Sequence, residues 1–159
     1  MARRRRPLID LTIPPRYDSV VAVRAELDRL PDPELTEARE DLELLVTELL
    51  TNSVRHAGMG EHERIGLRVS ETPPTLRVEV SDPGRGFDHE VREPPAGSPG
   101  GRGLLLVHRI ARRWGIGSDG GTRVWFEIPW RPRRRPPARR PADHAKGAVV
   151  GPSRSRSRS

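Results

Sequence analysis

The chain of 159 residues contains no cysteine and no long hydrophobic run. The lack of cysteine excludes disulfides, thiolate nucleophiles and zinc or iron–sulfur sites with cysteine ligands. The longest apolar stretches, at residues 42–50 and 104–107, are far shorter than the roughly 20 residues that span a membrane. The arginines near the N-terminus are not followed by the apolar segment of a secretory signal. We therefore expect a cytoplasmic protein that does not contact a membrane.

Lysine is almost missing too, because Lys146 is the only one in the chain. A P-loop and a eukaryotic-type protein kinase each need a lysine that neutralises nucleotide phosphates. Both classes are excluded for the folded part of the chain. Any nucleotide phosphate here has to be bound by other groups.

Charge is distributed very unevenly along the chain. Against a total of +7, residues 1–6 contribute +4 and residues 131–159 contribute +9, which leaves −6 for residues 7–130. Only 33% of the residues are hydrophobic and 4% aromatic, whereas 17 are proline, so part of the chain is not expected to fold. We predict a basic disordered N-terminus at 1–7, a folded domain at 8–130 and an Arg/Pro/Ser-rich disordered tail at 131–159.

Hydrophobic periodicity predicts helices and strands in the folded part. A long helix is indicated by residues that recur at steps of three and four, namely Leu35, Ala38, Leu42, Leu45, Leu49, Ser53 and Ala57. A shorter helix is expected from an N-cap at Asp18 or Ser19 to about Leu30, and a third from about Gly103 to Trp114. Alternation predicts strands at residues 8–13, 65–69, 76–80 and 122–129.

The order of these elements predicts the fold class. Strands gather in one layer and helices in another, so we expect an α+β two-layer sandwich with a mixed, mostly antiparallel sheet covered by helices on one face. The segment 83–102 is rich in glycine, proline and charge and is longer than an ordinary connection. It is predicted to be a functional lid or a disordered loop.

Three polar residues interrupt the long helix. Glu48, Asn52 and His56 are spaced four apart, so they form one stripe, and the last two fall close beside the apolar row. Alone, such a triplet is typical of a boundary row that hydrogen-bonds to loops.

A carboxylate occupies a position expected to point inward at the end of a strand. Asp82 has the same parity as the apolar residues of 76–80, and a buried carboxylate needs hydrogen-bond donors. Gly84 and Gly86 follow, and glycine allows close backbone approach. The D-x-G-x-G pattern by itself is also ordinary turn chemistry.

A glycine cluster opens the third helix. Gly101, Arg102, Gly103 and Leu104 lie at its start, where free N–H groups and the positive end of the helix dipole favour an anion. Such a site needs no lysine, in agreement with the composition. By itself the cluster is equally typical of a flexible loop joined to a helix.

In this order the segments read E-x-x-x-N-x-x-x-H, D-x-G-x-G and G-x-G-L-x-L-V. They resemble the three ATP-binding motifs of the Bergerat-fold superfamily, which includes gyrase, heat-shock chaperones, histidine kinases and mismatch-repair ATPases. The resemblance spans residues 8–130. The wording from Glu48 to Gly58 is most similar to the anti-sigma-factor serine kinases.

The resemblance implies ATP and Mg²⁺ as cofactors. Asp82 would accept a hydrogen bond from the adenine amino group, and Gly84 and Gly86 would let the backbone close over the base. Asn52 would hold Mg²⁺ through its amide oxygen. His56 and Leu104 would belong to the ATP site, and Gly101 and Gly103 would wrap the phosphates, with added charge from Arg102.

Glu48 would act as the general base that accepts the proton of an attacking serine hydroxyl. An intramolecular histidine kinase is a poor match, because none of the five histidines lies on a helix upstream of Glu48.

The resemblance implies a regulatory factor that phosphorylates a serine on a protein antagonist and sequesters a sigma factor or similar regulator, and that could form a homodimer. The first alternative is a non-catalytic, nucleotide-dependent binding module. The second alternative is a nucleic-acid-associated protein that acts through its basic tail. No aromatic residue follows Trp130, so base stacking is not available there.

Overall fold

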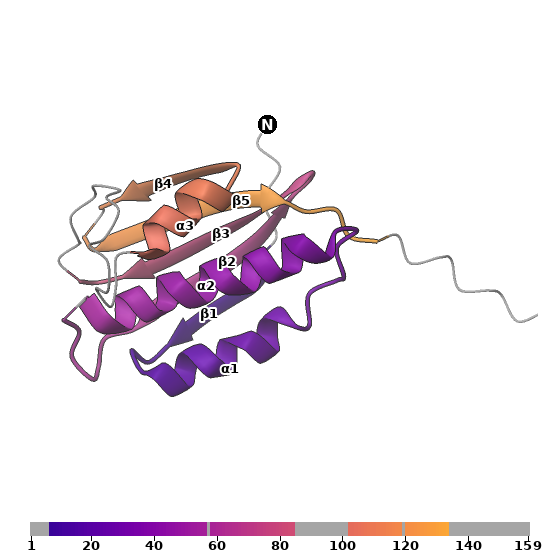
Figure 1. Cartoon of the computed structure of the whole chain (residues 1–159). Coiled ribbons are helices and arrows are strands. Elements are labelled where there is room, and N and C mark those ends of the chain that lie inside the picture. The colour runs from indigo at the N-terminus through magenta and orange to yellow at the C-terminus, as the bar shows by residue number, and fades with distance from the viewer. Residues whose placement is uncertain (1–6, 57, 85–101, 119, 134–159) are drawn as a thin grey trace, which may run out of the picture.

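The computed structural model describes residues 7–56, 58–84, 102–118 and 120–133. Along these residues the elements follow in the order β1 (Pro7–Ile13), α1 (Tyr17–Leu27), α2 (Thr36–His56), β2 (Ile65–Thr72), β3 (Thr75–Asp82), α3 (Arg102–Ile110), β4 (Arg113–Gly117) and β5 (Thr122–Pro129). Figure 1 shows the strands in one layer and the helices in a second layer over one face of the sheet. The predicted α+β two-layer sandwich is confirmed.

The sheet has five strands in the order β1-β2-β3-β5-β4. Every pairing is antiparallel, so the predicted mixed sheet is an antiparallel one in the described residues. The central strands β3 and β5 pair along their full length, and Asp82 at the end of β3 lies opposite Thr122 at the start of β5. This pairing brings two segments 40 residues apart in the sequence to the same end of the sheet.

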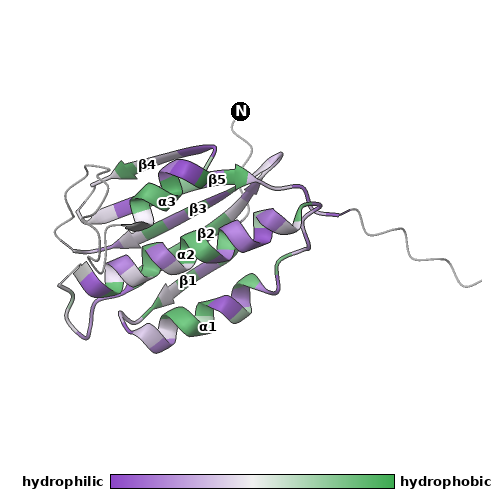
Figure 2. Cartoon of the chain, in the orientation of Figure 1, coloured by the Kyte–Doolittle hydropathy of each residue, from purple (hydrophilic) through white to green (hydrophobic). Residues whose placement is uncertain are grey.

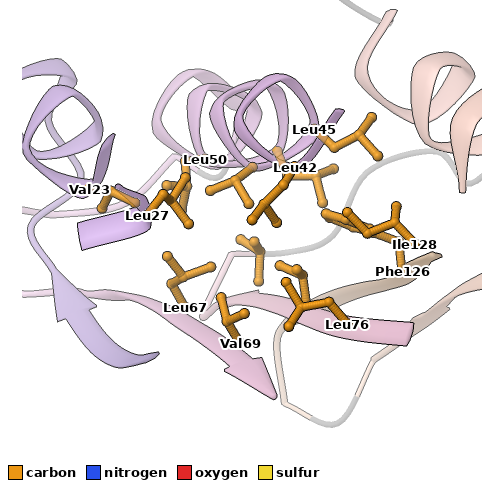
Figure 3. Packing of buried hydrophobic residues seen from close by; sticks show 14 of the residues in the cluster. Val23, Leu27, Leu42, Leu45, Leu50, Leu67, Val69, Leu76, Phe126 and Ile128 are labelled. Carbon is orange, nitrogen blue, oxygen red and sulfur yellow. The ribbon is translucent and has the colours of Figure 1, made fainter. Parts of the chain in front are cut away.

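The hydrophobic core lies between the helices and the sheet. Leu42, Leu45 and Leu50 of α2 lie on the side of the helix that faces the sheet, where Leu76 of β3 and Phe126 of β5 belong to the same core (Figure 3). All five side chains are fully buried. Full burial of a side chain of this size contributes about 1.5–3 kcal/mol. Helix α2 therefore has a fixed position over the centre of the sheet.

Polar residues interrupt the apolar surface of α2 in Figure 2, where purple turns alternate with green ones. Helix α2 also packs between α1 and α3. In the first half of α2, Arg39 donates hydrogen bonds to the carbonyl oxygens of Leu27 (3.0 Å), the last residue of α1, and of Leu30 (2.9 Å) just beyond it. This arginine fixes the angle at which the chain turns from one helix into the next.

The face of the sheet opposite the helices is polar and ionic. Arg77 of β3 lies over the ring of Trp125 of β5, with 3.9 Å between the guanidinium carbon and the ring centroid. The same arginine pairs with Glu79 (3.0 Å) and Glu127 (3.2 Å). On the other side of the tryptophan, a Cβ at Gly115 would lie 2.8 Å from the ring. The indole thus fills the space that the glycine of β4 leaves.

The third helix is shorter than predicted. It ends at Ile110, and residues 113–117, part of which were expected to be helical, form strand β4. The cause is the pairing of β4 with β5, in which Gly115 lies under Trp125. The expected order of elements was therefore wrong by one strand.

Two other details differ from the predicted helices. Arg16 takes the N-cap position of α1, and Asp18 lies in the first turn, where it pairs with Arg16. Leu35 precedes α2 and is exposed, so the apolar row begins at Ala38. Strand β5 agrees with the predicted range, and β1 lies at one edge of the sheet.

The segment after β5 is tied to the segment between α1 and α2. The backbone N–H of Glu34 donates to the carbonyl of Arg131 (2.7 Å), and that of Arg133 donates to the carbonyl of Asp32 (2.9 Å). Trp130 is buried here. Within the residues described, no helix is long and apolar enough to cross a membrane.

Candidate nucleotide-binding site

Asp82 is buried at the end of β3 and faces the helices. Its side chain follows the inward parity of Leu76, Val78 and Val80, as predicted, and the residue is 8% exposed. The hydroxyl of Ser53 donates to its Oδ2 (2.6 Å), and the backbone N–H of Gly84 donates to its Oδ1 (3.0 Å). Each oxygen retains a lone pair for a further donor.

Ser53 comes from the last turns of α2 and is also 8% exposed. Its spacing predicted a place in the apolar row of the helix, and its contact with the carboxylate was not predicted. The available signal was a hydroxyl in a row of leucines, because a buried hydroxyl needs a partner. This hydrogen bond joins α2 to the end of β3 and fixes the orientation of Asp82.

Thr122 lies opposite Asp82 on β5 and was also missed. It is 4% exposed, and its Oγ1 has no hydrogen-bond partner among the described residues. An unpaired buried hydroxyl destabilises a protein by about 1–3 kcal/mol. A carboxylate acceptor beside an orphaned hydroxyl fits the polar edge of a purine, which presents an amino donor next to a ring nitrogen acceptor.

Gly121 brings the two strands close together at this point. A Cβ built there would overlap the carbonyl oxygen of Asp82 and would lie 3.0 Å from the Cα of Pro83. Both neighbours are backbone atoms, so they cannot rotate away as a side chain can. The Gly-Gly pair before β5 was the sequence signal for this close approach.

Glu48 and Asn52 lie half-buried on α2, one helical turn apart. The start of α3 packs directly against them. A Cβ at Gly103 would overlap the Asn52 amide nitrogen and would lie 3.6 Å from the Glu48 Cβ. The absence of a side chain at this position lets the first turn of α3 contact both residues. Three of the predicted site residues are therefore brought together.

The remaining predicted residues are placed as follows. His56 is the last residue of α2 and Arg102 the first of α3, while Gly84 is buried beside Asp82. The side chain of Leu104 belongs to the hydrophobic core. Gly86 and Gly101 lie outside the described residues, as does most of the predicted lid at 83–102.

The donor set allows a test for a magnesium ion. The described residues contain no group of three or more His, Cys, Asp or Glu side chains that could hold a metal. Mg²⁺ in nucleotide sites uses one or two protein oxygens, substrate phosphates and water. The half-buried Asn52 amide beside the Glu48 carboxylate fits such a sparse site.

The profile of the histidine kinase-like ATPase domain matches residues 13–128. The chain belongs to this family. The family match covers all the described residues of the candidate site, from Glu48 to Thr122.

Proteins similar to this chain include two serine-protein kinases and a histidine kinase. The serine-protein kinases RsbW of Listeria innocua serovar 6a and Listeria monocytogenes serovar 1/2a are each 37% identical over 86 residues, which cover 46% of this chain and 55% of theirs. The chain thus spans about half the length of the curated relatives it matches. A blue-light activated histidine kinase of Erythrobacter litoralis EL346 is 26% identical, with a TM-score of 0.48 over 74% of this chain and 46% of that one. The predicted resemblance to the anti-sigma-factor serine kinases is confirmed.

Proposed function

We propose that the chain is an ATP-binding anti-sigma-type regulatory factor with serine protein kinase activity. It phosphorylates a serine on a protein antagonist and sequesters a sigma factor or a similar regulator. The similarity to serine-protein kinase RsbW supports this proposal. The structural observation that carries it is the contact of Gly103 with Asn52 and Glu48, because it joins the start of α3 to the polar stripe of α2.

In this proposal the base of ATP binds at the end of β3. Asp82 accepts a hydrogen bond from the adenine amino group while Ser53 and the Gly84 N–H hold the carboxylate in place. The Thr122 hydroxyl supplies a second polar group for the purine edge or for a bridging water. Gly86 follows Gly84 by two positions in the sequence, and a glycine there would let the backbone approach the base.

The phosphates bind at the junction of α2 and α3. The N–H groups of Gly103 and Leu104 at the start of α3 are the proposed phosphate donors. By their place in the sequence, Gly101 is proposed to add a further N–H group and Arg102 a positive charge. Asn52 would contribute an amide oxygen to Mg²⁺, and His56, the last residue of α2, is proposed to belong to the same site. When bound, the ion neutralises phosphate charge.

Glu48 is the proposed general base. It takes the proton from the serine hydroxyl of the antagonist as the serine oxygen forms a bond to the γ-phosphorus, the bond to the β–γ bridging oxygen breaks and ADP leaves. The position one turn before Asn52 keeps the carboxylate beside the metal and phosphate end of the site. The proposed partners are the antagonist, the sigma-type regulator and a second copy of the chain, and its cytoplasmic location stays a prediction.

Substitution of Glu48 tests the kinase activity. Proteins that copurify with the chain are incubated with γ-labelled ATP and Mg²⁺, and phosphoserine is identified by mass spectrometry. Glu48→Gln should lower phosphate transfer by about 100-fold or more, since general-base catalysis contributes about 10²–10⁴-fold. ATP affinity, measured by calorimetry, should change by less than threefold.

Glu40→Gln is the matched control, because Glu40 lies two turns earlier on the same helix and is exposed. It should leave both transfer and binding unchanged. Equal transfer by Glu48→Gln and the wild type would remove the proposed base. ATP binding without any transfer by the wild type would favour the non-catalytic binding module.

A further inference from the structure

A hollow lies on the open face of the sheet, on the opposite side of β3 from the Asp82 side chain. Its volume is about 270 Å³, and it is lined by the small residues Gly66, Ser81 and Gly121 and by two arginines, Arg64 and Arg123. Successive residues of a strand point to opposite faces, so Ser81 faces this hollow whereas Asp82 faces Ser53 of α2. Asp82 and Thr122 also line the hollow, so it meets the candidate nucleotide site at the end of β3, but the Ser81 side chain enters it from the opposite face of the sheet.

The floor of the hollow stays open because its residues are small. Gly66 of β2 pairs with Ser81 of β3, and a Cβ at Gly66 would lie 2.7 Å from the Ser81 hydroxyl oxygen. That hydroxyl makes no hydrogen bond within the described part of the chain. A second hollow of about 330 Å³ continues from Gly66, Ser81 and Arg123 toward β1.

The two arginines carry charge that no described carboxylate neutralises. Arg64 is held by its Nη1, which donates to the carbonyl oxygens of Glu61 and Glu63, both at 2.8 Å. Its Nε and Nη2 donate no hydrogen bond to a described residue. Arg123 forms no ion pair with any described residue.

The carboxylates that line the two hollows are already engaged. Asp82 is bound by Ser53 and Gly84, as described above. Asp10 pairs with Arg68 (2.9 Å), and Glu79 pairs with Arg77 (3.0 Å). Among the described residues that line the first hollow, the charges without an ionic partner are therefore those of Arg64 and Arg123, and the Ser81 hydroxyl is a further donor.

We propose that this hollow binds a phosphoryl group. The planar guanidinium groups of Arg64 and Arg123 match phosphate oxygens with paired N–H donors, and Ser81 adds a neutral donor on the floor. The volume accommodates inorganic phosphate or the phosphate of a phosphorylated side chain. The site does not depend on the proposed kinase function, because it uses the other face of the sheet.

The test follows backbone amide signals in ¹H–¹⁵N NMR spectra of the full chain at pH 7.5. Inorganic phosphate should cause saturable shifts of the Gly66 and Ser81 amides. Arg64→Gln and Arg123→Gln should each raise the apparent Kd by about fivefold or more. This factor is smaller than for a buried charge-assisted hydrogen bond, because water partly screens the exposed guanidinium groups. The matched control is Arg113→Gln, an exposed arginine of β4 outside the hollow, which should leave the Kd unchanged.

Titration with O-phosphoserine separates the two sources of the group. Tighter binding of O-phosphoserine supports the site with a phosphorylated side chain as the ligand, and tighter binding of inorganic phosphate supports it with the free ion. Absence of saturable shifts at Gly66 and Ser81 would overturn the proposal. Equal shifts with acetate, or an equal loss in Arg113→Gln, would overturn it as well.

Discussion

The two ends of the candidate nucleotide site are built in different ways. At the base end, Asp82, Ser53 and Thr122 are all buried, and strand pairing and a side-chain hydrogen bond hold them in place. At the phosphate end, Glu48 and Asn52 are half-buried, and the contact of α3 with α2 depends on one glycine. The base end is therefore preorganised by the folded core, whereas the phosphate end depends on the position of a single helix.

The largest effect is expected from Gly121→Ala, which acts on the base end. The added Cβ overlaps the main chain of Asp82, so strands β3 and β5 must separate where the carboxylate is held. Overpacking of this kind destabilises a fold by about 1–3 kcal/mol. Thermal unfolding should show a lower Tm, and calorimetry should show at least tenfold weaker binding of both ATP and adenosine.

The control for this substitution is Gly117→Ala at the end of β4. A Cβ there meets no described atom within 4 Å, so both the Tm and the affinity should be unchanged. If Gly121→Ala bound adenosine as the wild type does, the base end would not depend on this close approach.

An intermediate effect is expected from Gly103→Ala at the phosphate end. The methyl group displaces the amide of Asn52, the proposed magnesium ligand, and pushes α3 away from α2. ATP affinity in the presence of Mg²⁺ should fall by about three- to tenfold, equivalent to about 0.7–1.4 kcal/mol. Adenosine affinity should not change, because the base end is untouched. An equal loss for both ligands would show that the two ends are not independent.

The smallest effect is expected from Asp41→Asn, because Asp41 lies on α2 away from both ends of the site. Burial and the neighbouring carboxylates of Glu37 and Glu40 raise the pKa of Asp41 above its ordinary 3.8. The ionised form is thus penalised in the folded state, and stability is lost as the pH rises through the raised pKa. The variant should have a slightly higher Tm at pH 7.

This gain should disappear below pH 3.8, where Asp41 is protonated in both the folded and the unfolded chain. ATP binding should be the same in the variant and the wild type. A Tm that is unchanged at pH 7 would contradict the assigned penalty on the ionised Asp41 carboxylate. Weaker ATP binding would mean that the site extends farther along α2 than proposed.

Sequence periodicity predicted the direction of a side chain on its helix or strand better than it predicted the contacts between elements. The parity of Asp82 on its strand correctly indicated a buried carboxylate, and the spacing of Glu48 and Asn52 correctly placed them on one side of a helix. Both predictions depend only on local geometry. The contacts of Ser53 and Thr122 with the end of β3 could not be derived in this way, because they come from packing between distant segments.

Strand β4 shows the same limit in the fold. Its five residues include two glycines and give no clear alternation, and no proline or glycine marks the end of the preceding helix. The strand is defined by its pairing with β5 and by Trp125 lying on Gly115. That contact depends on a partner strand ten residues later, so a local pattern could not predict it.

We propose that the Asp82 carboxylate, held by Ser53, accepts a hydrogen bond from the amino group of adenine. Calorimetric comparison of ATP with purine riboside triphosphate, which lacks only that amino group, tests it most directly. A hydrogen bond to a charged acceptor contributes about 1.5–3 kcal/mol, so ATP should bind about 10- to 100-fold more tightly. Equal affinities of the two nucleotides for the wild-type chain would contradict the hydrogen bond proposed between adenine and Asp82.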